Sequence, residues 1–376
     1  MAYSPIRIAG AGPSGLAAAI VLARAGRAVE VHEAKRDVGM RFIGDLQVIE
    51  AASESESVPD FLDRIGIERN FYFRPATWAT FYDHRGTART IRSGAPYGWF
   101  IRRGAEEGTL DRGLLAQARA LGADVRFNSR LAPADADIVA TGPAAPDGLA
   151  REMTWRTGDA ERIDVFFNHK LSPGGYSYLF ILDGIATFGC AIVADFKRID
   201  DYFEHSLAEA RRLHAFEIPA ETRTGYSYMN FHLKATPNGA RYVGEAAGFQ
   251  DYLFGLGLRY ALTSGWLAAR SIVEGRDFDT SALAMKQETS LVNRFLYEAG
   301  GNFGLSMFVR QAARADDFHR YLSGWHEQRW WKRLLSPLVH RVWRHHGRCL
   351  HKPPEHWCRS RDTEMKVPPL GPVAGA

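Results

Sequence analysis

Three glycines near the N-terminus have the spacing of a phosphate-binding turn. Gly10, Gly12 and Gly15 follow a short apolar run in G-x-G-x-x-G order, and an Ala- and Leu-rich segment comes next. In such a turn the first glycine lets the strand enter a helix, the second lets a pyrophosphate approach the backbone, and the third allows close helix–strand packing. A second apolar run ends at Glu33, where an acid can accept hydrogen bonds from a ribose diol. The pattern predicts a βαβ unit that binds an adenine dinucleotide.

A second glycine-rich segment lies far along the chain. An apolar strand precedes Gly244 and the acid Glu245, and Gly255 and Gly257 come just before a helix predicted to begin near Leu258. This segment resembles the Gly-Asp motif of FAD-dependent oxidoreductases, in which the acid accepts a hydrogen bond from the ribityl chain. An NAD(P) dehydrogenase needs only the first motif, whereas the resemblance implies that FAD uses both. Here a glutamate stands where the motif usually has aspartate.

A third segment, residues 137–142, reads as a buried strand that ends in Ala-Thr-Gly. Small residues at this point let the backbone approach a ligand closely. Arg41, in the loop after the first βαβ unit, is a candidate partner of a cofactor phosphate, although a solvated arginine is equally expected there. The full set of predicted cofactor-binding residues is Gly10, Gly12, Pro13, Ser14, Gly15, Glu33, Ala34, Arg41, Arg103, Thr141, Gly142, Gly244, Glu245, Gly255, Gly257 and Leu258.

Flavin chemistry on a double bond also needs a proton donor and an apolar pocket. The period of two along a strand places Tyr176, Tyr178 and Phe180 on one face. Tyr176, Tyr178 and Asp45 are the candidate catalytic residues, with His232 as a further candidate for the proton donor. An aromatic row is more often a core or a cavity wall, and a lone histidine is more often a structural group. No nucleophile elbow and no paired metal-ligand spacing is present, which argues against hydrolase and zinc chemistry.

These features imply a discontinuous two-domain chain. The fold class predicted is α/β, with a Rossmann-type FAD-binding domain interleaved with a mainly antiparallel β-sheet substrate domain and followed by a C-terminal helical region. The FAD-binding domain is assigned residues 1–70, 101–150 and 236–290, and the substrate domain residues 71–100 and 151–235. The remaining residues, 291–376, form the helical region and a basic tail.

Over residues 5–290 the chain resembles the geranylgeranyl reductase branch of the para-hydroxybenzoate-hydroxylase-type flavoproteins. The glycine motifs carry this resemblance together with Leu171-Ser-Pro-Gly-Gly-Tyr-Ser-Tyr-Leu-Phe-Ile181, which is similar to the strand that lines the family's substrate cavity. Two departures stand out. Tyr178 and Ile181 occupy the family's Trp and Pro positions, and Ile43-Gly44-Asp45-Leu46 replaces its Cys-Gly-Glu loop. The resemblance implies FAD-dependent reduction of carbon–carbon double bonds in an isoprenoid or other apolar substrate.

Two other functions stay open. A flavin monooxygenase or halogenase of a small aromatic or natural-product substrate would use the same fold, and a non-catalytic flavin- or lipid-binding module would use the same pocket. The Trp-x-Trp-x-Ile sequence typical of halogenases is absent. The electron donor is expected to be NAD(P)H or a ferredoxin, because no second G-x-G-x-x-G indicates a separate nucleotide domain.

The amino-acid composition limits the classes of protein to which the chain can belong. The 376 residues are 46% hydrophobic with a net charge of +4, and three cysteines do not make a disulfide framework, so a cytoplasmic protein is expected. No apolar run is long enough to cross a membrane. Cys349 and Cys358 with nearby histidines have irregular spacing for a metal site, so no metal is predicted. Nothing in the sequence defines an oligomeric state.

The C-terminal segment mixes tryptophan and leucine with arginine and lysine between residues 325 and 344. This composition is typical of an interfacial amphipathic helix, and it predicts peripheral membrane contact. A helix packed on its own domain, with its basic residues in solvent, explains the same composition and is the more common case. Nucleic-acid binding is not expected, because no recognition motif accompanies the basic residues.

Overall fold

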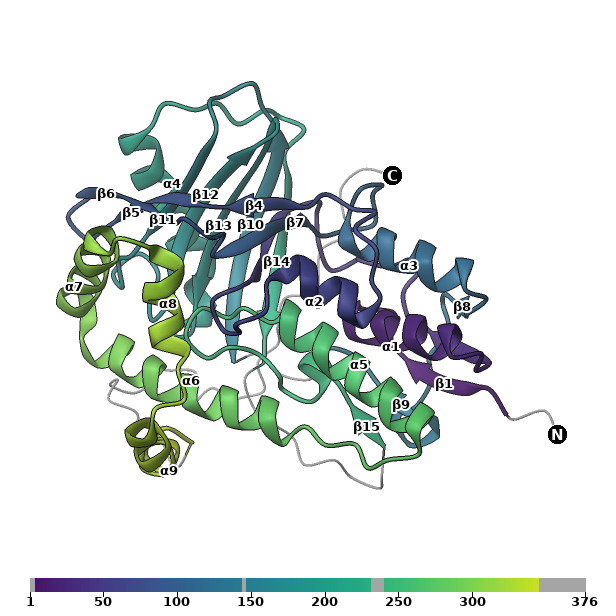
Figure 1. Cartoon of the computed structure of the whole chain (residues 1–376). Coiled ribbons are helices and arrows are strands. Elements are labelled where there is room, and N and C mark those ends of the chain that lie inside the picture. The colour runs from purple at the N-terminus through teal and green to yellow at the C-terminus, as the bar shows by residue number, and fades with distance from the viewer. Residues whose placement is uncertain (1–3, 144–146, 231–239, 345–376) are drawn as a thin grey trace.

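The computed structural model describes residues 4–143, 147–230 and 240–344, with side chains up to Val339 (Figure 1). Strands from distant parts of the sequence assemble into three sheets. A parallel sheet with its helices forms one half of the molecule. A large, mainly antiparallel sheet forms the other, and helices from the C-terminal part of the chain pack beside it.

The parallel sheet has five strands in the order β15-β9-β1-β2-β8, and every neighbouring pair is parallel. Alternation between strands and helices in the sequence produces this arrangement, because a parallel pair needs a long crossover connection. The strands are β1 (Ile6–Ala9), β2 (Val29–His32), β8 (Asp124–Arg126), β9 (Ile138–Val139) and β15 (Arg241–Tyr242).

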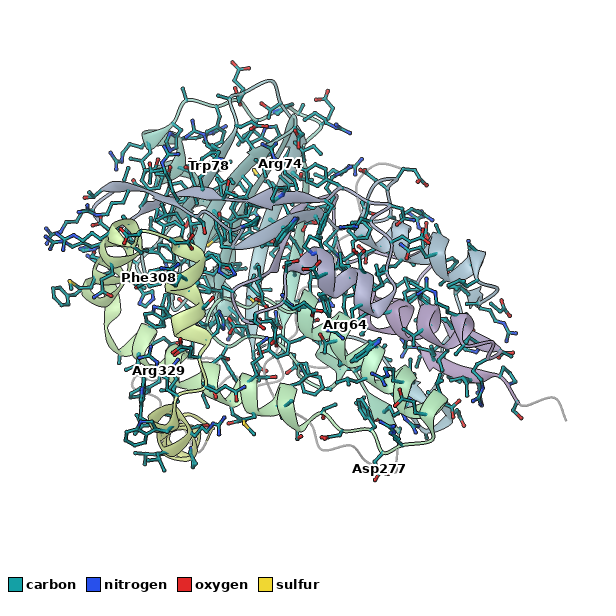
Figure 2. The ribbon with its side chains drawn as sticks, viewed as in Figure 1. Arg64, Arg74, Trp78, Asp277, Phe308 and Arg329 are labelled. Atoms are coloured by element: carbon teal, nitrogen blue, oxygen red, sulfur yellow. The ribbon has the colours of Figure 1, made fainter. Side chains whose placement is uncertain are left out.

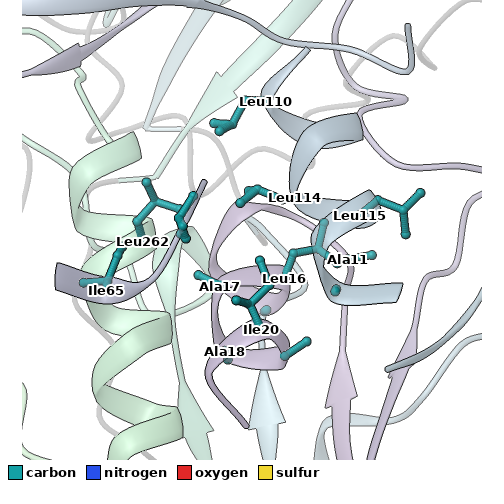
Figure 3. Packing of buried hydrophobic residues seen from close by; sticks show 14 of the residues in the cluster. Ala11, Leu16, Ala17, Ala18, Ile20, Ile65, Leu110, Leu114, Leu115 and Leu262 are labelled. Atoms are coloured by element: carbon teal, nitrogen blue, oxygen red, sulfur yellow. The ribbon is translucent and has the colours of Figure 1, made fainter. Parts of the chain in front are cut away.

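Four helices cover this sheet and share one apolar core with it. Figure 3 shows Leu16 and Ile20 of α1 close to Leu114 of α3 and Leu262 of α5. A Cβ on Gly265 of α5 would overlap the backbone carbonyl of Ser14, so glycine is what allows α1 and α5 to pack this closely. The helices are α1 (Pro13–Arg24), α2 (Val58–Ile65), α3 (Leu110–Ala120) and α5 (Leu258–Glu274).

The large sheet has seven strands in the order β14-β10-β13-β12-β11-β5-β6, and only the pair β11–β5 is parallel. Alternating side chains divide it into two faces. One face packs on α4 (Ile199–Leu213), and the other packs on aromatic residues of the C-terminal helices. The strands are β5 (Trp78–Tyr82), β6 (Ala88–Arg92), β10 (Gly148–Arg156), β11 (Arg162–Phe166), β12 (Tyr176–Leu182), β13 (Ile185–Ile192) and β14 (Arg223–Met229).

A small antiparallel sheet joins the two halves. It has the order β3-β7-β4, with β3 (Leu46–Glu50), β7 (Gly98–Arg102) and β4 (Arg74–Ala76). The expected substrate domain, residues 71–100 and 151–235, supplies the seven-stranded sheet except that β10 begins before residue 151. Residues 74–76 and 98–100 differ from the expectation, because they pair with each other and with β3 instead of joining the large sheet.

The C-terminal helices are α6 (Ser281–Ala299), α7 (Gly301–Arg314), α8 (Phe318–His326) and α9 (Trp330–Arg344). Figure 2 labels Phe308 on α7 and Arg329 just before α9. Short 3₁₀ turns occur at η1 (Pro133–Asp135), η2 (Phe196–Arg198) and η4 (Gly244–Ala246). Within the described part of the chain, no helix combines the length and the apolar character needed to cross a bilayer.

Candidate functional site

Three loops meet at the carboxyl edge of the parallel sheet. They follow the neighbouring strands β1, β9 and β15 and carry Gly10, Gly142 and Gly244, respectively. All three glycines have positive φ angles, a backbone conformation that favours glycine. The carboxyl edge of an open parallel sheet is where α/β proteins bind nucleotides. Three motifs that lie far apart in the sequence therefore arrive at one place.

The first loop has the geometry of a diphosphate cradle. A Cβ on Gly10 would overlap the carbonyl of Ala140, and one on Gly15 would overlap the carbonyl of Gly10. A Cβ on Gly12, by contrast, would meet nothing within 4 Å. Two glycines are thus needed for packing, while the third faces open space at the start of α1. This helix has Pro13 in its first turn and no side-chain cap, so its N-terminal dipole is available to an anion.

Glu33 is fixed directly beside this cradle. Its two carboxylate oxygens accept hydrogen bonds from the backbone N–H of Ala11 at 2.9 Å and of Lys35 at 3.0 Å. A carboxylate has about four acceptor positions, so two remain for further donors. The position suits the acceptance of ribose hydroxyls expected from the sequence.

An ion pair links the third loop to the loop between β2 and β3. The Arg41 guanidinium donates to Glu245 at 3.0 Å and to the carbonyl of Tyr228 at 3.1 Å. Its Nη1 atom also lies 3.3 Å from where a Cβ on Gly142 would be. The structure therefore brings together the residue predicted to bind a phosphate and the acid predicted to bind the ribityl chain. Both side chains are about one quarter exposed, which leaves them accessible to a ligand.

The first and last motifs are in direct contact. A Cβ on Gly244 would lie 2.7 Å from the Ser14 hydroxyl, and the Gly244 N–H donates to Ser264 of α5 at 2.9 Å. The helix α5 begins at Leu258 after Gly255 and Gly257, again without a side-chain cap. A single extended nucleotide can consequently contact the N-terminus of α1 and the loop before α5.

Arg103 lies below this surface. It is buried and forms a bidentate ion pair with Asp111 of α3 at 2.8 and 2.9 Å, with its guanidinium 3.9 Å from the centre of the Phe42 ring. The backbone of Arg103 pairs with the backbone of Gly44 and Asp45. Arg103 thus supports the loop that carries Arg41. Ala34 and Thr141, also predicted to bind the cofactor, are exposed beside the cradle.

A polar row crosses the large sheet where the sheet meets this loop. In register, Glu152 of β10 lies opposite Gly189 of β13, which in turn lies opposite Tyr178 of β12. Gly189 has no side chain, so the Tyr178 ring can lie over it. The Tyr178 hydroxyl donates a hydrogen bond to the Glu152 carboxylate. Ser227 of β14 donates to the second Glu152 oxygen at 3.0 Å.

Asp45, in the loop just before β3, lies near Glu152 of this row. It is fully buried and accepts hydrogen bonds from the Ile43 N–H at 3.0 Å and from the Gln47 amide at 2.7 Å. The Ile43 side chain reaches the sheet, since a Cβ on Gly225, the residue opposite Glu152, would be 3.0 Å from it. Burial raises the pKa of Asp45. Burial and the nearby Asp45 carboxyl raise the pKa of Glu152 to about 7.

These shifts predict a pH dependence of stability. The pKa of Glu152 is raised from its ordinary value of 4.5 to about 7, so the folded state binds more protons than the unfolded state in this range. The free energy of unfolding therefore falls as the pH rises from about 4.5 to 7. We expect Glu152→Gln to remove a slope worth up to about 3 kcal/mol between about pH 4.5 and 7. Urea unfolding at several pH values measures this slope, and an unchanged slope would contradict the placement of Glu152.

The other candidate proton donor, Tyr176, is already bonded. Its hydroxyl donates to the carbonyl of Phe254 at 2.7 Å, and burial raises its pKa. Tyr178 and Phe180 stack at 4.7 Å within an aromatic cluster that includes Phe308 of α7. The C-terminal helices therefore cover much of the sheet face that was expected to line the apolar substrate pocket.

Two surface hollows of about 370 and 380 Å³ lie elsewhere. One is lined by β5–β6 and α7 residues including His84, and the other by residues near Arg241 and Asp277. Three residues weighed from the sequence as a proton donor or metal ligands, His232, Cys349 and Cys358, fall outside the described residues. In the part of the chain that the structure describes, no group of three His, Cys, Asp or Glu side chains could hold a metal.

Fold and site together define a Rossmann-type unit joined to an antiparallel sheet. A family model described as an NAD(P)-binding Rossmann-like domain matches residues 8–43, which cover the first motif and Arg41. No curated protein matches the sequence.

Solved structures share this architecture over most of the chain. A geranylgeranyl bacteriochlorophyll reductase-like protein from Thermoplasma acidophilum is 17% identical with a TM-score of 0.65, and the match covers 90% of this chain and 97% of that one. A flavoprotein/dehydrogenase from Cytophaga hutchinsonii is 16% identical with a TM-score of 0.61, covering 89% and 98%. A flavin-dependent brominase variant is 16% identical with a TM-score of 0.59, covering 90% and 99%. The expected likeness in fold to the geranylgeranyl reductase branch is confirmed.

Proposed function

We propose that the protein is an FAD-dependent oxidoreductase. The observation that carries this proposal is the meeting of three glycine loops, from β1, β9 and β15, around the uncapped N-terminus of α1. The residues proposed to hold FAD are Gly12, Ser14, Glu33, Arg41 and Glu245. When bound, FAD would supply two-electron chemistry, by hydride transfer or by reaction of its reduced form with oxygen.

We further propose that the reaction is reduction of a carbon–carbon double bond in an isoprenoid or other apolar substrate. Support comes from the aromatic row Tyr176, Tyr178 and Phe180, which gives one face of the large sheet its apolar character. The reductase-like neighbour has the same architecture. In this reaction the chain's residues hold the substrate in an apolar setting, exclude water and supply one proton. NAD(P)H or a ferredoxin would provide the electrons, in the cytoplasm or at a membrane surface.

A monooxygenase or halogenase reaction is the second candidate, favoured by the brominase neighbour of similar fold. Anaerobic reduction separates the two. The FAD-loaded protein is reduced with dithionite and mixed either with a prenyl acceptor or with oxygen and NAD(P)H. Reoxidation by the prenyl acceptor with loss of one double bond supports the reductase. Substrate-dependent oxygen consumption with a hydroxylated or halogenated product would overturn it.

The helix α9 offers a surface suited to a lipid substrate. Lys332, Ser336 and Val339 face the body, where Ser336 donates to the carbonyl of Glu288 on α6 at 3.2 Å. The opposite face exposes large apolar side chains: Trp330 is 74% exposed, Leu334 69% and Leu338 58%. Arg329 and Arg333 are exposed beside them. Exposed apolar side chains with flanking cations are the composition that binds anionic bilayers.

We therefore expect the protein to bind vesicles that contain phosphatidylglycerol. Substituting Trp330, Leu334 and Leu338 together by serine should lower the bound fraction at least roughly tenfold, because the apolar contact area is lost. Flotation with neutral and anionic vesicles measures this. Phe303→Ser is the matched control, since Phe303 is an equally exposed residue of α7, and it should bind as the unaltered protein does. Equal binding by the triple variant, or a dimer of the unaltered protein held together by this face, would contradict the proposal.

A further inference from the structure

The surface hollow between the β5–β6 hairpin and α7 has no part in the proposed flavin site. Its volume is about 370 Å³, which is large enough for a small molecule. In Figure 1 its elements, β5, β6 and α7, lie at the opposite end of the molecule from α1 and β1. A ligand in this hollow would therefore bind separately from the dinucleotide.

The helix wall of the hollow is a single face of α7. Phe303, Ser306, Met307 and Arg310 have the spacing i, i+3, i+4, i+7, so they share one side of the helix. The two apolar members of this face are uncovered, since Phe303 is 77% exposed and Met307 38%. The helix thus presents an aromatic ring, a thioether and a guanidinium group to the hollow.

The opposite wall is the β5–β6 hairpin. Arg89 lies on the same face of β6 as Ile91, which is buried in a core shared with α7. Arg85 lies in the turn between the two strands. His84 Nδ1 and Ser306 Oγ are 2.9 Å apart, and this hydrogen bond ties the hairpin to the helix. The shape of the hollow is therefore set by two elements that are packed and bonded to each other.

The charges around the hollow are unbalanced. Arg85, Arg89 and Arg310 line it, and none of the three forms an ion pair within the described part of the chain. Asp83 is the one carboxylate among the described residues of the lining, and it accepts two backbone N–H groups of the hairpin turn at 2.9 and 3.1 Å. Three guanidinium groups and one carboxylate give the lining a net charge of +2.

This charge and the exposed ring define the chemistry of a ligand. A phosphate monoester carries about −1.5 to −2 charges at pH 7, which balances the lining, whereas a carboxylate would balance only half of it. Guanidinium groups bind phosphate oxygens through paired hydrogen bonds. The uncovered ring of Phe303 offers a surface on which a second aromatic ring can pack.

We propose that the hollow binds a small phosphate ester that carries an aromatic ring. The phosphate contacts the guanidinium groups of Arg89 and Arg310, and the ring packs on Phe303. This site does not depend on the proposed function, because its residues lie outside the glycine loops and the aromatic row of the large sheet.

Fluorescence titration with naphthyl phosphate tests the site, with inorganic phosphate as a competitor that lacks the ring. We expect one probe molecule per chain. Inorganic phosphate should displace it only at a concentration at least roughly tenfold higher, because it has no contact with Phe303. Excess FAD should leave the probe bound. Displacement of the probe by FAD would place it in the dinucleotide cradle and overturn the inference.

Two variants separate the charged and the aromatic parts of the site. Replacing Arg89 and Arg310 together by glutamine should weaken naphthyl phosphate binding at least roughly thirtyfold, because charge-assisted hydrogen bonds are lost. Phe303→Ser should weaken it roughly tenfold and leave the affinity for inorganic phosphate unchanged. Circular dichroism verifies that each variant is folded. An unchanged affinity for naphthyl phosphate in either folded variant would overturn the inference.

Arg314→Gln is the matched control for the charge. Arg314 is exposed on α7, one turn beyond Arg310, and it does not line the hollow. Arg310→Gln alone should weaken naphthyl phosphate binding roughly fivefold, and Arg314→Gln by less than about twofold. Equal losses in these two variants would show that binding follows the general surface charge and would contradict a defined site. A chain that binds no FAD would refute the proposed function alone, because this titration needs no flavin.

Discussion

Gly15→Ala is expected to destabilise the protein by at least about 3 kcal/mol or to prevent folding. The added methyl group would overlap the carbonyl of Gly10 and lie 3.1 Å from the Cβ of Ala140. Both neighbours belong to the ends of paired core strands, so neither can move without breaking the parallel sheet. Urea unfolding of the purified variant measures the loss, with expression yield as the readout if the variant does not fold.

The same glycine-to-alanine substitution at another position of the loop serves as the control. Gly12→Ala adds the same methyl group earlier in the same loop, where nothing lies within 4 Å and φ is −79°. Its free energy of unfolding should change by less than about 1 kcal/mol. Equal stability of the two variants would show that α1 does not pack on β1 and β9 as described.

The second large effect is expected on cofactor binding, and the same substitution, Gly12→Ala, should produce it. The methyl group points into the open space at the N-terminus of α1, where the diphosphate would approach the backbone. We expect FAD affinity to fall by about 100-fold, about 3 kcal/mol of binding free energy, with the fold intact. Fluorescence titration of the apo protein with FAD gives the dissociation constant for each variant.

Arg41→Lys gives a milder comparison in the same titration. It keeps the positive charge near Glu245 but loses the planar contacts to Glu245 and the Tyr228 carbonyl. Its affinity should fall less than that of Gly12→Ala. A Gly12→Ala protein that binds FAD as tightly as the unaltered chain would place the cofactor elsewhere.

Local signals in the sequence were sufficient for much of the parallel half. The glycine spacing predicted α1, and Gly255 and Gly257 predicted the start of α5 near Leu258, because these signals act within a few residues. Strand alternation likewise placed Tyr176, Tyr178 and Phe180 on one face. The convergence of Gly10, Gly142 and Gly244 followed from the rule that parallel strands share one carboxyl edge.

The junction between the halves was not predictable from such signals. Glu152 lies in a segment with no motif, and only the cross-strand register of β10, β13 and β12 places it beside Tyr178. The one hint was Gly189 between aromatic strands, since a glycine inside a strand often marks a close approach. The pairing of Arg103 with the buried Asp111, which lies on a separate element, had no local signal either. The aromatic cover from α7 depends on long-range packing as well.

The most direct test of the proposed site is whether one FAD binds at the carboxyl edge of the parallel sheet. The purified chain is examined by visible absorption, and the small molecules released on denaturation are identified by mass spectrometry. We predict a yellow protein, or a colourless one that binds added FAD at one molecule per chain, with binding weakened by Gly12→Ala. A chain that neither carries nor takes up FAD, while remaining folded, would contradict this prediction.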